Sequence, residues 1–386
     1  MGDAVTVAAI PDIRAYRDPF GACLADERQE LDNAGFAATV RAVSGVFAAA
    51  GLGAGDVVAI ALPNRVEFVT SLFAAWRLGA AVTPVDPAST GAREQIADAS
   101  ATLIVLDDMA AAKLCGIALP VVSLDAVSAP ARPGPPAPAS SISDMPALLI
   151  YPGDETGRPT GVVLDHANVG AAAQRICGWY AMDSATRSLL VRPLVEVDTI
   201  MVSVVAPLLS AGSAVIVDAL DEDGARVVIE RATPTYLSAD PGTYRRLVTG
   251  PVYRSMATDL RYAISCGSAM PDELILEFER LYCVPMVEAY GTAECTAYCT
   301  ANPVYGLRKP GTVGLPLPDV DVGVVDARGG LLPSGVAGEV VVRGPNVMRG
   351  YLGRPRESAH RLRGGWFHSG ETGMFDQDGY LMLPDR

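Results

Sequence analysis

The chain has 386 residues, of which 50% are hydrophobic and 19% charged, a composition typical of a globular protein with two or three packed units rather than of a disordered one. With 44 acidic and 30 basic residues, the net charge of −14 argues against a protein that binds nucleic acid or an anionic membrane over a broad surface. The apolar runs fall short of the roughly 18 residues that span a bilayer, and the N-terminus lacks a basic segment before an apolar one, so we predict a cytoplasmic protein without a membrane span.

The first part of the chain alternates helical and strand patterns. Apolar residues at helical spacing predict two helices, and short apolar runs predict four strands. The helices are expected over 36–52 and 65–80, and the strands over 55–63, 81–87, 101–108 and 120–127. This order indicates parallel βαβ units in a first α/β subdomain over residues 1–143. Its last segment, 128–143, is rich in Pro, Ala and Ser and is expected to be an extended connection.

A second series of strands and helices follows, and we assign it to a second α/β subdomain over residues 144–305. Strands are expected over 147–151, 188–194, 213–218 and 235–240, and helices over 166–180, 199–212 and 223–232. From residue 306 to 386, short apolar runs separated by Gly and Pro predict a small β subdomain. The predicted fold is therefore α/β, with two doubly wound sheets packed together plus a small distorted β subdomain. In such folds, ligands bind at the carboxyl ends of parallel strands.

Four segments carry chemistry that the element pattern does not explain. They are IYPGDETGRPTGVVLDH (150–166), SCGSAMP with EAYGTAE (265–271 and 288–294), GEVVVRGPNVMRGYLG (338–353) and GWFHSGETGMFDQDGYL (365–381). In this order and spacing they resemble the adenylate-forming (AMP-binding) ligase superfamily, which includes acyl-CoA synthetases and fatty-acyl-AMP ligases. The resemblance covers essentially the whole chain.

The resemblance implies a reaction and its ligands. The expected reaction is ATP + carboxylic acid → acyl-AMP + pyrophosphate, followed by thioester formation with CoA or a carrier thiol. It implies ATP or AMP and Mg²⁺ as ligands, with a small carboxylic acid or acyl-adenylate as substrate. The chain ends at Arg386, where family members continue through a hinge into a mobile C-terminal domain with a catalytic Lys. We therefore expect a large N-terminal domain only, with a carrier protein or a separate C-terminal domain as a further partner.

The resemblance also assigns a nucleotide site. The matching residues are Gly267, Ser268, Ala269, Glu288, Ala289, Tyr290, Gly291, Thr292, Glu371 and Arg386. In the family, the counterpart of Tyr290 stacks on adenine, that of Glu371 holds the ribose, and that of Glu294 binds Mg²⁺. Two alternatives remain: Tyr290 as a core aromatic residue, and Glu294 as a carboxylate at a helix N-terminus.

The phosphate loop departs from the family pattern. Its residues include Gly153, Asp154, Glu155, Thr156, Gly157 and Thr160. A loop that holds a triphosphate presents backbone N–H groups, hydroxyls and an ammonium to anionic oxygens. Here Pro152 removes one donor, Asp154 and Glu155 add two negative charges, and Thr160 stands where the family has Lys. We therefore predict a degenerate loop and impaired ATP-driven adenylation.

Two hypotheses of different classes follow. In the first, the chain is an acyl-CoA synthetase-like ligase that works with a weakened loop. In the second, it is a catalytically inactive homologue that binds an acyl group, an adenylate or a protein partner. No catalytic residue is assigned securely.

Residues near the acyl site leave further alternatives. The family's aromatic or His gate aligns with Val195 and Glu196. Asp198 precedes an apolar helix and is predicted to be its N-cap, whereas in peptide-synthetase relatives an Asp near this point binds an amino group. His166 and His368 are predicted to have structural roles.

Overall fold

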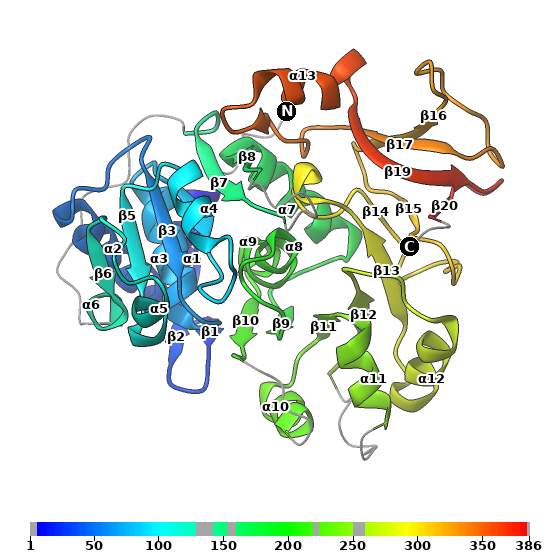
Figure 1. The fold of residues 1–386 in the computed structure, drawn as a ribbon. Coiled ribbons are helices and arrows are strands. Elements are labelled where there is room, and N and C mark those ends of the chain that lie inside the picture. Colours follow the sequence, from blue (N-terminus) through cyan, green and yellow to red (C-terminus); the bar gives the residue numbers. More distant parts are fainter. Residues whose placement is uncertain (1–5, 129–141, 153–159, 219–223, 250–258, 384–386) are drawn as a thin grey trace.

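The computed structural model describes residues 6–128, 142–152, 160–218, 224–249 and 259–383. It shows two large sheets with helices around them and a smaller sheet that contains the last strands (Figure 1). The predicted α/β architecture with two packed sheets and a small β subdomain is therefore confirmed. Within the described residues, none of the helices is long and apolar enough to cross a membrane.

The first sheet has seven strands. They are β3 (Val57–Ala61), β4 (Ala81–Pro84), β5 (Leu103–Leu106), β6 (Val121–Ser123), β7 (Pro146–Ile150), β8 (Val162–Asp165) and β18 (Gly350–Tyr351). Their order in the sheet is β18-β8-β7-β4-β3-β5-β6. The five strands from β7 to β6 are parallel, and β8 and β18 add antiparallel pairings at one edge. The helices of this part are α2 (Asn33–Ala49), α3 (Val66–Arg77), α4 (Ala92–Asp98), α5 (Asp108–Lys113) and α6 (Leu124–Ser128).

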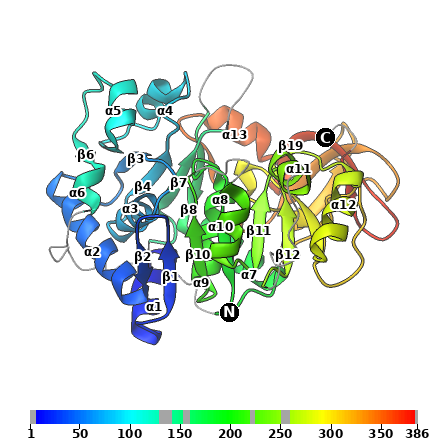
Figure 2. The same cartoon turned by 90° about the horizontal axis from the view of Figure 1, so that it is seen from below.

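The second sheet has nine strands. They are β1 (Ala22–Ala25), β2 (Glu30–Asp32), β9 (Arg187–Leu190), β10 (Ser213–Ile216), β11 (Tyr236–Ala239), β12 (Tyr262–Ser265), β13 (Met286–Tyr290), β14 (Thr300–Ala301) and β15 (Leu315–Pro316). Their order is β15-β14-β13-β12-β11-β9-β10-β1-β2, and Figure 2 shows β1 and β2 beside β10. The helices are α1 (Ile10–Arg17), α7 (His166–Trp179), α8 (Val197–Ile200), α9 (Ala206–Leu209), α10 (Gly224–Ala232), α11 (Pro241–Thr249) and α12 (Asp272–Tyr282).

The third sheet is antiparallel and has four strands. They are β16 (Asp321–Val325), β17 (Gly338–Arg343), β19 (Phe367–Phe375) and β20 (Leu381–Met382), in that order across the sheet. The helix α13 (Pro355–Arg361) precedes β19. Gly329, at positive φ, lies in the turn that brings Leu331 back beside Val325 at the end of β16, a conformation that glycine adopts readily. The predicted β subdomain thus forms, while β14, β15 and β18 of the same part of the chain join the larger sheets.

Helix α3 lies at the centre of the core because it is buried along its whole length. Phe73 and Trp76 contact each other edge to face at 5.1 Å, and the Trp76 indole donates a hydrogen bond of 2.9 Å to the Ala147 carbonyl of β7. One continuous set of buried apolar residues extends from this helix into both large sheets. Burial on every face explains why the predicted helix has few polar positions.

Three details differ from the sequence expectation. The strand expected over 120–127 ends at Ser123, and α6 begins at Leu124. The helix expected over 199–212 begins at Val197 and contains a π-helical turn at Met201–Val205. The boundary at 143/144 does not separate the two sheets, because β7 and β8 pair beside β4 while β1 and β2 join the second sheet. Strand pairing between distant segments has no local sequence signal, so tertiary packing decides which sheet each of these strands joins.

Candidate functional site

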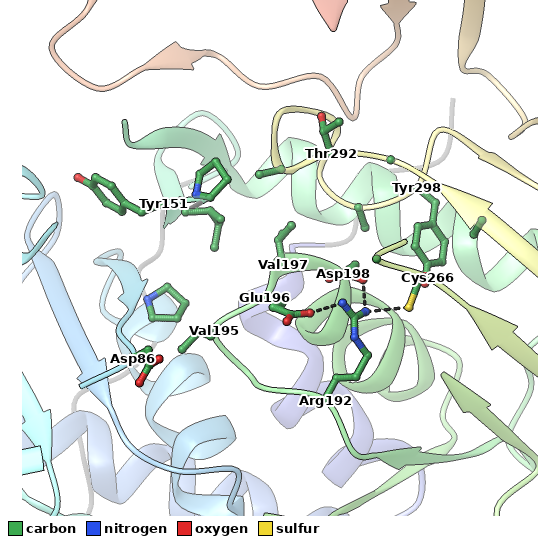
Figure 3. Close-up of a pocket in the computed structure, with 18 of the residues that line it drawn as sticks. Asp86, Tyr151, Arg192, Val195, Glu196, Val197, Asp198, Cys266, Thr292 and Tyr298 are labelled. Carbon is green, nitrogen blue, oxygen red and sulfur yellow. Dashed lines mark hydrogen bonds and ion pairs between the residues drawn. The ribbon is translucent and has the colours of Figure 1, made fainter. Parts of the chain in front are cut away.

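A cavity of about 410 Å³ lies where the two large sheets meet. Figure 3 shows residues that line it. They come from segments that follow β4, β7, β9, β12 and β13, so the cavity is built at the carboxyl ends of parallel strands, as expected for this class of fold. The lining residues are Pro84, Asp86, Ser89, Gln95, Ile150, Tyr151, Pro152, Arg192, Val195, Glu196, Val197, Asp198, Cys266, Gly267, Ala289, Gly291, Thr292, Ala293, Ala297 and Tyr298.

One end of this cavity contains a cluster of ionic side chains, which we call the Arg192 cluster: Arg192, Glu196, Asp198 and Cys266 (Figure 3). The guanidinium Nη2 of Arg192 donates to Glu196, and Nη1 donates to Asp198. Nη1 also contacts the Cys266 Sγ at 2.8 Å. Partners in the segments after β9 and β12 thus hold the guanidinium in a fixed position.

The segment that carries these side chains is anchored from another part of the chain. The Asn64 side chain donates a hydrogen bond of 2.9 Å to the Arg192 carbonyl, and its oxygen accepts one of 2.9 Å from the Leu194 N–H. Because Asn64 lies just before α3, the central helix fixes the loop after β9.

The predicted N-cap role of Asp198 is wrong. The N-cap position of α8 is Glu196, and no side chain caps this helix. The carboxylate of Asp198 binds Arg192 instead, because an ionic partner within reach outweighs a hydrogen bond to a helix N–H.

Burial shifts the protonation equilibria of this cluster. It raises the pKa of Glu196 against the opposing effect of Arg192, and the negative charges of Asp198 and Asp240 add to the increase. Burial likewise raises the pKa of the Cys266 thiol to about 11, although Arg192 opposes the shift. At neutral pH the thiol is therefore protonated, and Cys266 is not a reactive thiolate.

Strand β13 presents alternate residues to two different places. Ala289 and Gly291 face the cavity, whereas Glu288 lines a separate pocket of about 90 Å³, as the period of two in a strand requires. A Cβ at Gly291 would stand 1.6 Å from the Ala297 carbonyl oxygen, so only glycine fits there. Of the predicted nucleotide residues in this segment, Ala289, Gly291 and Thr292 line the cavity.

Tyr290 and Glu371 lie close together although 81 positions of sequence separate them. The residue Tyr290 is 1% exposed. Burial raises the pKa of its hydroxyl, and the Cys299 thiol and the Glu371 carboxylate raise it further. Both the buried position and these neighbours fit the alternative of a core aromatic residue. Stacking of adenine on this ring remains a prediction and requires the atoms that cover it to move.

Glu294 lies in a 3₁₀ turn at Ala293–Cys295. Its Oε1 accepts a hydrogen bond of 2.9 Å from the Tyr351 hydroxyl, and its carbonyl accepts one of 2.7 Å from the Met348 N–H. A single turn of three residues contributes little dipole, so the carboxylate has no helix to stabilise it. Among the described residues, no group of three or more His, Cys, Asp or Glu side chains forms a metal site. One carboxylate fits Mg²⁺ that is bound mainly through nucleotide phosphates.

The structure describes only the two ends of the phosphate loop. Gly153, Asp154, Glu155, Thr156 and Gly157 lie outside the described residues, as does Arg386. At the ends of the loop, the Tyr151 hydroxyl donates a hydrogen bond of 2.8 Å to Asp98. A Cβ at Gly161 would stand 2.8 Å from the Tyr151 ring. The half-buried Thr160 precedes this close contact.

The loop after β12 contributes less than predicted to the cavity. Gly267 lines it, with φ of +89°. A Cβ at this position would stand 3.3 Å from Nη2 of Arg192. Ser268 and Ala269 are exposed and are not among the lining residues. The predicted structural roles of the histidines agree with their burial, 2% exposed for His166 and 5% for His368.

Comparison with known proteins identifies the family. The family model described as AMP-binding enzyme matches residues 6–352. The chain belongs to this family. A feruloyl-CoA synthase from an Amycolatopsis species is 29% identical over 97% of this chain and 77% of its own length. A sulfoacetate–CoA ligase of Cupriavidus necator is 30% identical over 99% of this chain and 78% of its own length.

Solved structures share the fold of this chain. MatB from Rhodopseudomonas palustris superimposes with a TM-score of 0.90 at 26% identity, covering 98% of this chain and 78% of MatB. VinN superimposes with a TM-score of 0.88 at 25% identity, covering 98% of both chains. The predicted membership in the adenylate-forming ligases is therefore confirmed.

Several cavity residues of this chain were missed by sequence reasoning. Arg192 and Tyr298 line the cavity but were not predicted to do so, whereas Cys266 lies in the predicted motif at 265–271 without an assigned role. A signal existed for Arg192, since it follows a buried strand and precedes acidic residues at positions 196 and 198. Tyr298 gives no such signal, because a buried Tyr is usually an ordinary core residue.

Proposed function

We propose that this chain binds a small carboxylic acid and its adenylate in the cavity between the two sheets, as part of the family reaction, and that its ATP-driven first step is impaired. The observation that carries the proposal is the cavity itself, which runs from the Arg192 cluster to Gly291 and Thr292 of the family's nucleotide motif. An acyl group at the cluster end places its carboxylate toward the nucleotide end. This arrangement suits attack on an α-phosphorus held there.

Residues on the nucleotide side would hold the ligands that the family reaction needs. Glu294 would hold Mg²⁺ together with phosphate oxygens, and Glu371 would accept hydrogen bonds from ribose hydroxyls. Bound Mg²⁺ neutralises the charge that develops on the phosphates. Thr292, Ala293 and Gly267 line the cavity and would lie between its nucleotide and acyl parts.

The proposed weakness lies at the triphosphate. Asp154 and Glu155 add negative charge, and Thr160 provides no ammonium. Two carboxylates within about 6 Å of phosphate oxygens each cost roughly 1–3 kcal/mol at an effective dielectric constant near 20. Lys occurs only at positions 113 and 309 of this sequence, and neither lines the cavity. This deficit also supports the second candidate function, a catalytically inactive homologue that holds an acyl group or adenylate.

Calorimetric titration tests the proposal. We expect AMP and a non-hydrolysable acyl-adenylate to bind the chain, and ATP with Mg²⁺ to bind about tenfold more weakly than AMP, a difference of about 1.4 kcal/mol. Equal affinities for ATP and AMP would show that the loop is competent. If none of the three ligands binds, the proposed function itself is wrong.

A further inference from the structure

Strand β19 contains a bulge at Glu371, the residue that the family resemblance assigns to the ribose. The bulge faces β17, which lies beside β19 in the small sheet (Figure 1). The pairing register shifts between Glu339 and Val341 of β17, where one residue of β17 lies opposite the three residues 369–371 of β19. Gly370, in the middle of the bulge, has φ of +79°. Because a bulge changes the direction of the side chains that it carries, its shape decides where the Glu371 carboxylate points.

Local hydrogen bonds close this bulge. The Ser369 hydroxyl donates a hydrogen bond of 2.8 Å to the Val340 carbonyl and accepts one of 3.0 Å from the Glu371 N–H. Helix α13 packs against the bulge, since a Cβ at Gly370 would stand 2.9 Å from Nη1 of Arg361. The backbone before Glu371 therefore has little room for another conformation.

The carboxylate of Glu339 holds the bulge from the neighbouring strand. Its Oε1 accepts a hydrogen bond of 3.2 Å from the Gly370 N–H. Its Oε2 lies 2.8 Å from Nδ1 of His368 and accepts a hydrogen bond of 3.2 Å from Nη2 of Arg363. The side chain of Glu339 is 29% exposed and that of His368 is 6% exposed. Charge-assisted hydrogen bonds at such a partly buried position are stronger than those of an exposed ion pair.

The protonation of Glu339 agrees with this role. Burial acts to raise the pKa of this carboxyl group, but the hydrogen bond and charge of His368, together with Arg363 and the Gly370 N–H, lower it below its ordinary value. The group is therefore ionised at neutral pH, and the charged form is the one that accepts these hydrogen bonds.

We propose that Glu339 is a positioning residue for Glu371, and that it holds the bulge in the shape that presents the Glu371 carboxylate to the ribose hydroxyls of a bound nucleotide. This inference rests on the proposed function, because it assumes that Glu371 binds the ribose. The Glu371 residue is exposed and its side chain is long. A backbone that is already fixed reduces the conformational entropy that this side chain loses when the nucleotide binds.

A second ion pair in the same sheet provides a matched comparison. Asp321 of β16 pairs with Arg343 of β17 at 2.8 Å, and both of its hydrogen bonds join these two strands. This pair thus also links strands of the small sheet through a carboxylate, but its bonds do not involve the bulge. A purely structural effect is expected from either carboxylate, whereas an effect on ribose binding is expected from Glu339 alone.

Two nucleotides that differ only at the ribose test the inference. AMP and 2′,3′-dideoxy-AMP are titrated calorimetrically into the chain, and the ratio of their dissociation constants measures the contribution of the ribose hydroxyls. We expect dideoxy-AMP to bind about tenfold more weakly than AMP. Glu371→Ala is expected to bring this ratio close to one, because it removes the acceptor of the hydroxyls.

Variants of Glu339 then measure the positioning effect. Glu339→Gln keeps the shape of the side chain but removes its charge, and is expected to lower the ratio to about threefold or less. Glu339→Asp keeps the charge but withdraws it from the Gly370 N–H, and should also lower the ratio. The two variants act independently, so one of them tests the inference if the other does not fold. Asp321→Asn is the control and should preserve the ratio.

A double variant separates positioning from a general loss of stability. In the Glu371→Ala background, the additional change Glu339→Gln should leave the ratio unchanged, because the two residues act on the same ribose contact. A merely structural role of Glu339 would weaken the binding of both nucleotides alike and would keep the ratio near tenfold.

The remaining outcomes distinguish this inference from the proposed function. A ratio that stays near tenfold in the folded Glu339 variants, while Glu371→Ala abolishes it, overturns the inference and leaves the proposed function intact. A ratio that persists in Glu371→Ala shows that Glu371 does not bind the ribose, which overturns the inference together with that assignment. A chain that binds neither nucleotide contradicts the proposed function as well.

Discussion

His166 is an imidazole that the fold keeps neutral. It is 2% exposed, and its ring lies edge to face with Trp76 at 5.7 Å. Burial lowers its pKa to about 4. In the unfolded chain the same group takes up a proton near pH 6.5. The contribution of His166 to stability is therefore complete above pH 6.5 and is lost as the pH falls toward 4.

This shift predicts an acid-sensitive term in the free energy of unfolding. We expect His166 to destabilise the fold by about 2.5 kcal/mol between pH 7 and pH 4.5. In His166→Phe, which keeps an aromatic ring against Trp76, this loss should be absent. Urea unfolding of both proteins at pH 7, 5.5 and 4.5 measures the difference. His360→Gln, at an exposed position of α13, is the control, and identical pH dependence of wild type and His166→Phe would contradict the prediction.

At the scale of elements, β7 and β8 hold the two ends of the loop that the sequence predicts to be degenerate. At one end, Tyr151 binds Asp98 and packs against Gly161. At the other end, the Leu352 N–H donates a hydrogen bond of 2.7 Å to the Gly161 carbonyl. These contacts involve neither acidic residue of the loop. The ends of the loop are therefore fixed independently of whether the loop binds phosphate.

Restoring family-like residues in this loop should restore affinity for the triphosphate. We expect the variant Asp154→Gly, Glu155→Thr, Thr160→Lys to bind ATP with Mg²⁺ about tenfold more tightly, or about 1.4 kcal/mol, because two repulsive charges are removed and an ammonium is added. Calorimetry measures the dissociation constants. Thr160→Ser, which adds no charge, serves as the control. An unchanged constant in the triple variant would show that the loop is not the cause of weak binding.

At the scale of the whole molecule, both lysine side chains of the sequence lie away from the cavity. The Lys309 ammonium lies 2.5 Å from carboxylate oxygens of both Asp376 and Asp378 and 4.6 Å from the centre of the Tyr380 ring. It ties the turn before β20 to the segment before β15. Lys113 lies at the end of α5. Neither ammonium is placed to stabilise an adenylation transition state in the cavity.

We therefore expect this 386-residue chain to release pyrophosphate at close to the background rate. Adding a separately expressed C-terminal domain of a relative should raise the rate by roughly a hundredfold, since a positioned Lys supplies charge stabilisation and proximity. The measurement is pyrophosphate release with short acids in the presence of CoA. Rapid release by the chain alone would contradict both the impaired-loop prediction and the inactive-homologue hypothesis.

The sequence by itself determined the types of most elements and the family of the chain. Local patterns were sufficient for α3 at Val66–Arg77 and for β3 at Val57–Ala61, because hydrophobic periodicity is a property of consecutive residues. The four motifs were also local, and their order along the chain carried the resemblance. Neither kind of information depends on which strands become neighbours.

Only the tertiary structure decided sheet membership and the chemistry of the acyl end. Arg192 and Cys266 are 74 positions apart, and no local pattern predicts that their side chains meet. The same holds for the ion pair that removed Asp198 from its predicted capping role. Such contacts arise where loops from separate parallel strands converge at one edge of a sheet, so the charge that distinguishes this cavity became visible only after the strands were placed in order.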